Sequence, residues 1–136
     1  MATAPTYATT PNAGTPATLT TGNPVTDGSP SSGRALIFTA GANGSYLPFL
    51  RVKPLGNNVA SVLRVFLNNA SDPGVPGNNA LIYELALPQS TLSQTAPMGH
   101  YEVPVGVVPP LQRIYVFLGT TVVAGVTVVP MNAGDL

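Results

Sequence analysis

The stretch Val59-Ala-Ser-Val-Leu-Arg-Val-Phe-Leu-Asn68 decides the fold, and after a turn-rich loop it is followed by Ala80-Leu-Ile-Tyr-Glu-Leu-Ala-Leu87. In both stretches apolar residues recur at every second position, and this period is typical of half-buried β-strands. The loop 69–79 contains Asp-Pro-Gly and Pro-Gly-Asn-Asn, which favour turns and exclude a helix. The sequence therefore predicts two strands joined by a loop.

The alternation also predicts which side chains share a face of each strand. The first strand should place Leu63, Val65 and Leu67 on one face, opposite Val62, Arg64 and Phe66. The second strand should place Leu81, Tyr83, Leu85 and Leu87 on one face, opposite Ile82, Glu84 and Ala86. If the register brings them together, Arg64 and Glu84 form a structural cross-strand pair worth about 0.2–1 kcal/mol.

The same alternation continues along the rest of the chain. Further strands are predicted over residues 34–40, 45–53, 98–105, 112–119 and 122–130. Pro48 marks a bulge or an edge position in the second of these. Strands at roughly ten-residue spacing, with no amphipathic helix, predict an all-β domain. We expect an antiparallel β-sandwich or jelly roll of about seven to eight strands.

Residues 1–33 differ in composition from residues 34–136, which form the predicted sandwich domain. The first 33 residues are rich in Pro, Thr, Ala and Gly, and their single charge is Asp27. They are either a linker-like tail or an extended N-terminal arm that orders on a neighbouring subunit, with 17–21 as a short edge strand. The scarcity of charge favours the arm, because solvated disordered segments are usually highly charged. Its large apolar residues are Met1, Tyr7, Leu19 and Val25.

The composition narrows the class of protein. A chain of 136 residues is long enough for one domain with one core. Charged residues make up 7% of it, against about 25% in ordinary domains. Such a surface suits an assembly subunit or an extracellular β domain. The net charge is zero and the five basic residues are scattered, so nucleic acid is not an expected partner.

Several other features are absent from the sequence. There is no cysteine, which excludes disulfides and thiolate metal sites. The first residues lack the basic and apolar regions of a secretory signal. The longest apolar run, near 122–129, is far below the roughly 20 residues needed to span a bilayer. We expect a soluble protein made in the cytoplasm, with no membrane partner.

Catalytic residues are not expected. The chain has one histidine, His100, and its only acids on predicted strands are Glu84 and Glu102. These two could form a glycosidase pair, but pairing with Arg64 and Arg113 accounts for them better. Turn formation likewise accounts for the Asn and Asp residues of the loop 69–79 better than calcium binding does. We therefore predict no enzyme activity, no metal site and no cofactor.

Aromatic residues offer one further interpretation. They could line a platform for a carbohydrate, although alternation places Tyr83 and Tyr101 with core residues and favours packing or subunit contacts. The residues concerned are Tyr46, Phe49, Tyr83, Tyr101 and Tyr115.

A family resemblance adds to these observations. The residues that carry it lie in three runs: Leu50-Arg-Val-Lys-Pro-Leu-Gly-Asn-Asn-Val-Ala-Ser-Val-Leu-Arg-Val-Phe-Leu-Asn-Asn, Gly77-Asn-Asn-Ala-Leu-Ile-Tyr-Glu-Leu-Ala-Leu-Pro and Leu111-Gln-Arg-Ile-Tyr-Val-Phe-Leu-Gly-Thr. These runs resemble small virion-associated proteins of tailed bacteriophages and prophages. The resemblance covers about residues 50–130 and rests on structural rather than catalytic motifs. It implies a β-rich structural protein of the particle, such as a capsid decoration (cement) protein.

On this hypothesis the protein is a homotrimer on the capsid surface that binds the major capsid protein and copies of itself. The alternative is a tail- or fibre-associated adaptor or receptor-binding module that recognises glycans. The candidate interaction residues lie in the arm and in the loop 69–79: Tyr7, Leu19, Val25, Asp72, Val75 and Asn78.

Overall fold

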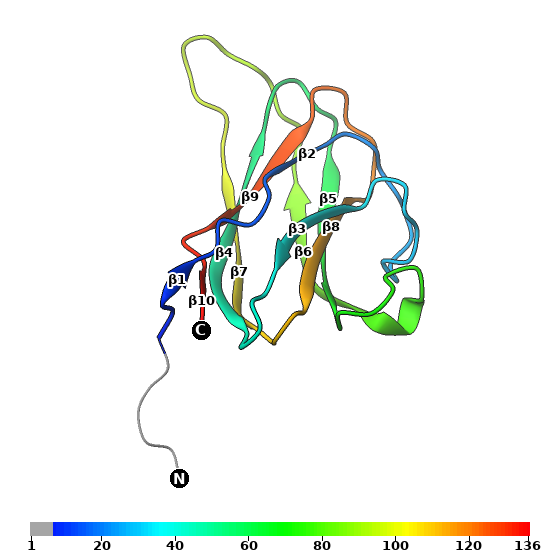
Figure 1. The fold of residues 1–136 in the computed structure, drawn as a ribbon. Coiled ribbons are helices and arrows are strands. Elements are labelled where there is room, and N and C mark those ends of the chain that lie inside the picture. The colour runs from blue at the N-terminus through cyan, green and yellow to red at the C-terminus, as the bar shows by residue number, and fades with distance from the viewer. Residues whose placement is uncertain (1–6) are drawn as a thin grey trace.

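The computed structural model describes residues 7–136 and shows two antiparallel β-sheets, which confirms the all-β prediction (Figure 1). Within these residues there are ten strands rather than seven or eight, because the terminal regions add three strands of two or three residues. The strands are β1 (Thr10–Pro11), β2 (Ala17–Leu19), β3 (Ala35–Thr39), β4 (Ser45–Pro54), β5 (Ser61–Asn68), β6 (Asn79–Leu87), β7 (Tyr101–Val108), β8 (Arg113–Leu118), β9 (Val126–Met131) and β10 (Gly134–Asp135). A 3-10 helix of three residues, η1 (Pro76–Asn78), lies in the loop before β6, where we expected no helix. Proline is tolerated in a first helical turn, because its missing N–H group would make no bond there.

One sheet is built around β4 and the other around β5. In the β4 sheet, β7 pairs with one side of β4, while β9 and β10 pair with the other side; β2 extends β9 and β1 extends β10. In the β5 sheet the order is β3-β8-β5-β6. Both sheets contribute to one hydrophobic cluster, which includes Leu50 and Val103 from the β4 sheet and Leu63, Val65 and Ile114 from the β5 sheet. This shared core holds the two sheets together, because apolar burial contributes about 25 cal/mol per Å².

The strand β5 has the faces that its sequence predicts. Leu63 and Val65 are fully buried in the shared core, whereas Phe66 packs with Tyr115 and Phe117 in a second cluster on the outer face. The rings of Phe66 and Phe117 meet edge to face with their centroids 5.4 Å apart, a favourable aromatic geometry.

The face predicted for Leu81 is wrong. The register of β5 and β6 shifts between Val65 and Phe66, so that Leu81 lies opposite Phe66 while Tyr83 lies opposite Val65. Tyr83 packs against the shared core, but Leu81 is exposed. An extra residue in a strand reverses the alternation beyond it, and sequence periodicity does not locate such a bulge.

Pro48 lies in the middle of a central strand, not at an edge. β4 pairs with β10 through Ser45 and Tyr46 and with β9 from Phe49 onward. Pro48 falls between these two partners, and the ladder with β7 on the other side of β4 pairs Leu47 and Phe49 but skips Pro48, which has no N–H group to donate.

The described part of the segment 1–33 packs on its own chain rather than extending away from it. β1 pairs with β10, β2 pairs with β9, and Gly22 forms a bridge with Leu118 of the other sheet. Figure 1 shows this segment, in blue to cyan, passing β2 and descending beside the green loop that holds η1. Met1 and the next five residues lie outside the described residues.

Candidate contact surfaces

The loop 69–79 is held by its own polar side chains. Asp72 Oδ1 accepts a hydrogen bond from the Gly74 amide at 2.9 Å, and Asn78 Nδ2 donates to the Asp72 carbonyl at 2.9 Å. Asn69 Oδ1 accepts from the Ser71 amide at 3.1 Å. These side chains form the turn, as Asn and Asp commonly do.

Two asparagines anchor this loop to the sheet. Asn68 is fully buried, and its Nδ2 donates to Asn79 Oδ1 at 2.9 Å while its Oδ1 accepts from the Ala70 amide at 2.9 Å. Asn79 Nδ2 donates to the carbonyl of Pro73 at 2.8 Å and to that of Asp27 at 3.2 Å. The second bond joins the loop to the N-terminal segment.

Residues 23–34 cover the outer face of the β5 sheet beside this loop. The Arg34 guanidinium lies 5.2 Å from the centroid of the Tyr115 ring, a cation–π distance. It donates to the Ser29 carbonyl at 3.3 Å. The Asp27 carboxylate accepts bonds from the Ser29 hydroxyl at 2.7 Å and the Ser29 amide at 2.9 Å, and these bonds lower the pKa of Asp27. We call the loop 69–79 and the segment 23–34 together the tip surface.

The structure brings some of the candidate interaction residues together and separates others. Val25, Asp72, Val75 and Asn78 all belong to the tip surface, and the first three are exposed. Tyr7 is 73% exposed and lies ahead of β1. Leu19 differs from the expectation of an intermolecular contact, because it is only 5% exposed and lies in the core of its own chain.

Arg64 and Glu84 lie directly opposite each other on β5 and β6. Arg64 Nε is 2.9 Å from Glu84 Oε1. Gly119 leaves room for this arginine, since a Cβ at that position would lie 3.1 Å from Arg64 Nη1 and 2.5 Å from Val62 Cγ1.

The partner expected for Glu102 is wrong. Glu102 lies opposite Arg51 in the β4–β7 ladder, and the two side chains are 3.5 Å apart. Arg113 belongs to the other sheet, where its Nη1 donates to the Tyr115 hydroxyl at 3.1 Å and its Nη2 to the Ser71 carbonyl at 3.4 Å. The order in which the strands pair decides which arginine lies next to Glu102, and the sequence does not specify that order.

The groups considered for catalysis do not converge. Glu84 is on the β5 sheet and Glu102 is on the β4 sheet, and each is bound to an arginine. His100 is exposed just before β7. Among residues 7–136, no three or more His, Cys, Asp or Glu side chains are grouped so that they could hold a metal ion. The absence of enzyme activity stays a prediction.

A polar cluster around Asp135 was not predicted. Asp135 Oδ1 accepts bonds from Ser45 Oγ at 2.6 Å and from Asn12 Nδ2 at 2.8 Å, while Ser45 Oγ accepts from the Gly41 amide at 2.9 Å. The bond from Ser45, followed by that from Asn12, lowers the pKa of Asp135. The cluster ties the start of the chain and its last strand to β4. No sequence spacing indicates it, because its members come together only through the sheet.

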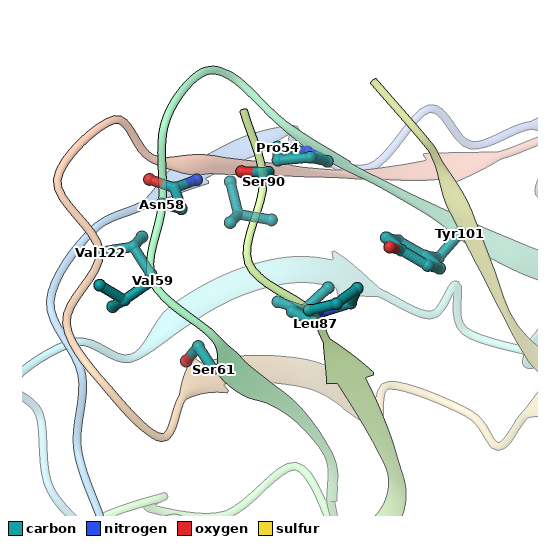
Figure 2. A pocket seen from close by; sticks show the side chains of 10 residues that line it. Pro54, Asn58, Val59, Ser61, Leu87, Ser90, Tyr101 and Val122 are labelled. Atoms are coloured by element: carbon teal, nitrogen blue, oxygen red, sulfur yellow. The ribbon is translucent and has the colours of Figure 1, made fainter. Parts of the chain in front are cut away.

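A small pocket opens at one end of the core, between the two sheets (Figure 2). It is lined mainly by apolar groups, including Leu87, Val122 and the ring of Tyr101. The buried Asn58 at its wall uses both ends of its amide, donating to the Gly125 carbonyl and accepting from the Ala124 amide at 2.9 Å each. The cavity volume open to a water-sized sphere is about 10 Å³, whereas ligand sites usually measure about 300–1,000 Å³. It carries no sign of a ligand site.

The aromatic residues divide between the core and the surface. Tyr83 and Tyr101 pack against the shared core and Tyr115 is buried. Tyr46 is 46% exposed, and Phe49, on the same strand, has the Arg51 guanidinium 5.7 Å from its ring centroid.

Within residues 7–136 the structure contains no helix with the length and apolar character required to cross a membrane. No family model, curated protein or solved structure matches this chain.

Proposed function

We propose that this protein is a structural subunit of a bacteriophage virion, specifically a capsid decoration (cement) protein. In this proposal the two sheets form a β-sandwich of the jelly-roll type, and the protein sits on the capsid surface as a homotrimer bound to the major capsid protein. It is made in the host cytoplasm and acts without catalysis.

The observation that carries the proposal is that all ten charged side chains are engaged within the chain. Arg51 and Arg64 form ion pairs with Glu102 and Glu84. The other six are held by hydrogen bonds, namely Asp27, Arg34, Lys53, Asp72, Arg113 and Asp135. Because charged residues make up 7% of the chain, the surface consists mainly of uncharged polar and apolar groups. Such a surface suits packing against a neighbour better than it suits nucleic acid or a charged substrate.

The tip surface is the proposed site of attachment. Its loop is fixed by its own hydrogen bonds, so binding a neighbour orders little additional chain. Val75 is 49% exposed and Val25 is 37% exposed, and burying them against the capsid would contribute about 25 cal/mol per Å² of apolar area. Residues 7–33 already pack on their own domain. In this proposal the contact with a neighbouring subunit, which the sequence suggested for an extended arm, is therefore made by the tip surface and by Tyr7.

Copy number per purified particle tests this function. A cement protein covers repeated positions of the head, so quantitative gel analysis should find hundreds of copies per particle. About a dozen copies or fewer, the number expected at a symmetric tail structure, would contradict a role on the head.

The alternative function is glycan binding on a tail or fibre. Tyr46 and the Phe49–Arg51 pair favour it, because an aromatic face beside charged hydrogen-bonding groups suits a sugar ring. A low copy number, together with glycan binding that is lost on Tyr46→Ala, would support it over the cement role.

A further inference from the structure

The two flanks of the paired sheets are covered differently. At one flank, where β2 and β3 end their sheets, the N-terminal segment crosses between the sheets. There Leu19 is buried in the core, the Thr15 amide donates to the Ile37 carbonyl at 2.8 Å, and Gly22 bridges Leu118. At the other flank the sheets end in β6 and β7, and among residues 7–136 no strand pairs with the outer edge of either.

Core side chains are only partly covered at this second flank. Tyr83 and Leu85 of β6 and Tyr101 and Val105 of β7 pack against the shared core but are half-buried. A shallow groove runs along β6 past Leu81 and Ile82, which are both exposed. The core is therefore bordered at this flank by apolar side chains that are partly exposed to solvent.

The edge of β7 is protected against pairing, whereas the edge of β6 is not. β7 contains Pro104, which has no N–H group to donate, and Gly106, whose φ of 103° breaks the regular strand geometry. β6 contains neither proline nor glycine. Its single charge, Glu84, is bound to Arg64. Beyond the bulge near Ile82, the five residues Tyr83–Leu87 pair regularly with β5.

We propose that β6 is a self-association edge, on which β6 of a second copy adds as an antiparallel strand. The twofold axis would pass at Leu85, the middle of the regular segment. Leu85 would then meet Leu85 of the partner subunit and Tyr83 would meet Leu87 of the partner subunit, so that the half-buried Tyr83 and Leu85 become covered. Glu84 would lie opposite Ala86 of the partner subunit.

The charges of the edge select a second copy as the occupant. Because Glu84 is already paired with Arg64, a basic peptide would have to share this carboxylate, and an acidic peptide would meet a like charge. An identical strand brings no unpaired charge, and this register keeps the two Glu84 carboxylates from lying opposite each other, which would be destabilising. A twofold contact of this kind can join two free chains or two neighbouring trimers, and it does not depend on the proposed role in a virion.

Two substitutions at Ala86 test the edge and its register, because Ala86 is exposed and lies opposite Glu84 of the partner subunit. Sedimentation equilibrium should show that the wild-type chain dimerises. Ala86→Glu should raise the dimer dissociation constant about tenfold, through two like-charge pairs, whereas Ala86→Lys should leave it equal or lower. Val123→Glu, at an 89% exposed position away from β6, should not change it.

Three results would overturn the proposal: a wild-type chain that stays monomeric at high concentration, equal effects of the two Ala86 variants, or an effect of Val123→Glu as large as that of Ala86→Glu. Hydrogen–deuterium exchange of the wild-type chain gives a check that needs no variant. Amides in Tyr83–Leu87 should exchange more slowly as concentration rises, and unchanged exchange in a dimer would place the interface elsewhere.

Discussion

At the scale of single residues, several of the few charged side chains connect segments that are distant in the sequence. Asp135 is the clearest case, because it joins Asn12, near the start of the chain, to Ser45 of β4 through one carboxylate oxygen. Arg34 joins the N-terminal segment to Tyr115 by a cation–π contact. These contacts hold Asn12, the last strand and the segment 23–34 against the two sheets.

The Asp135 cluster predicts a specific dependence of stability on pH. Its hydrogen bonds lower the pKa of the folded carboxyl, so its contribution is complete above the unfolded pKa of about 4 and is lost as pH falls through the folded pKa. Asp135→Asn should therefore be less stable than the wild type at neutral pH. The difference should shrink in acid, as measured by denaturant unfolding across pH.

Ser45→Ala supplies the control, because it removes the largest cause of the lowered pKa. The effects of the two substitutions on the free energy of unfolding should not be additive at neutral pH, since both substitutions break the same hydrogen bond. A stability difference between Asp135→Asn and the wild type that stays constant down to strong acid would contradict this account.

Ala70 predicts a stabilising substitution. Its φ of 73° lies in the left-handed region, where the Cβ of an L-residue costs about 1–2 kcal/mol. After allowing for the greater freedom of glycine in the unfolded chain, Ala70→Gly should raise the free energy of unfolding by about 0.5–1 kcal/mol. The matched change Ala80→Gly, within β6, should lower the free energy of unfolding by a similar amount. If both substitutions lowered the free energy of unfolding, the backbone at Ala70 would not be strained.

At the scale of elements, the N-terminal segment behaves as part of the fold. Leu19 is the side chain that fixes it, since β2 contributes this residue to the shared core. Residues before and after it follow the sheets mainly through backbone bonds. The segment should therefore unfold together with the domain.

Leu19→Ala tests this coupling. Truncating a buried leucine costs about 2–5 kcal/mol, so the variant should lose that much unfolding free energy in one cooperative transition. Val25→Ala, at an exposed position of the same segment, should change it by less than about 0.5 kcal/mol. Full stability of Leu19→Ala would show that the segment is independent of the core.

The elements also show what the sequence could predict. Alternation located the seven longer strands and the faces of β5, because side chains of a strand point alternately to its two faces. It misplaced Leu81, since a bulge changes the phase without a sequence marker. A short edge strand was predicted over 17–21, where β2 lies, but its pairing within its own chain was not, because backbone pairing at a sheet edge requires no apolar pattern.

At the scale of the whole molecule, strand order decides which distant residues meet. Glu102 meets Arg51, and Ser45 meets Asp135, only because of how the strands pair. The loop 69–79, in contrast, was predictable as a turn from its Asn, Asp, Pro and Gly residues alone. The hydrogen bond by which Asn79 attaches the loop to Asp27 was not predictable, because it requires the N-terminal segment to return across the β5 sheet.

The central claim is that this chain attaches to a phage head through a surface that carries few charges. The most direct test is the binding of the purified protein to heads stripped of it, measured at low and at high salt. Contacts made mainly by uncharged groups are little affected by salt screening, so the dissociation constant should stay within about twofold. A loss of about tenfold or more at high salt, or no binding at either salt concentration, would contradict the claim.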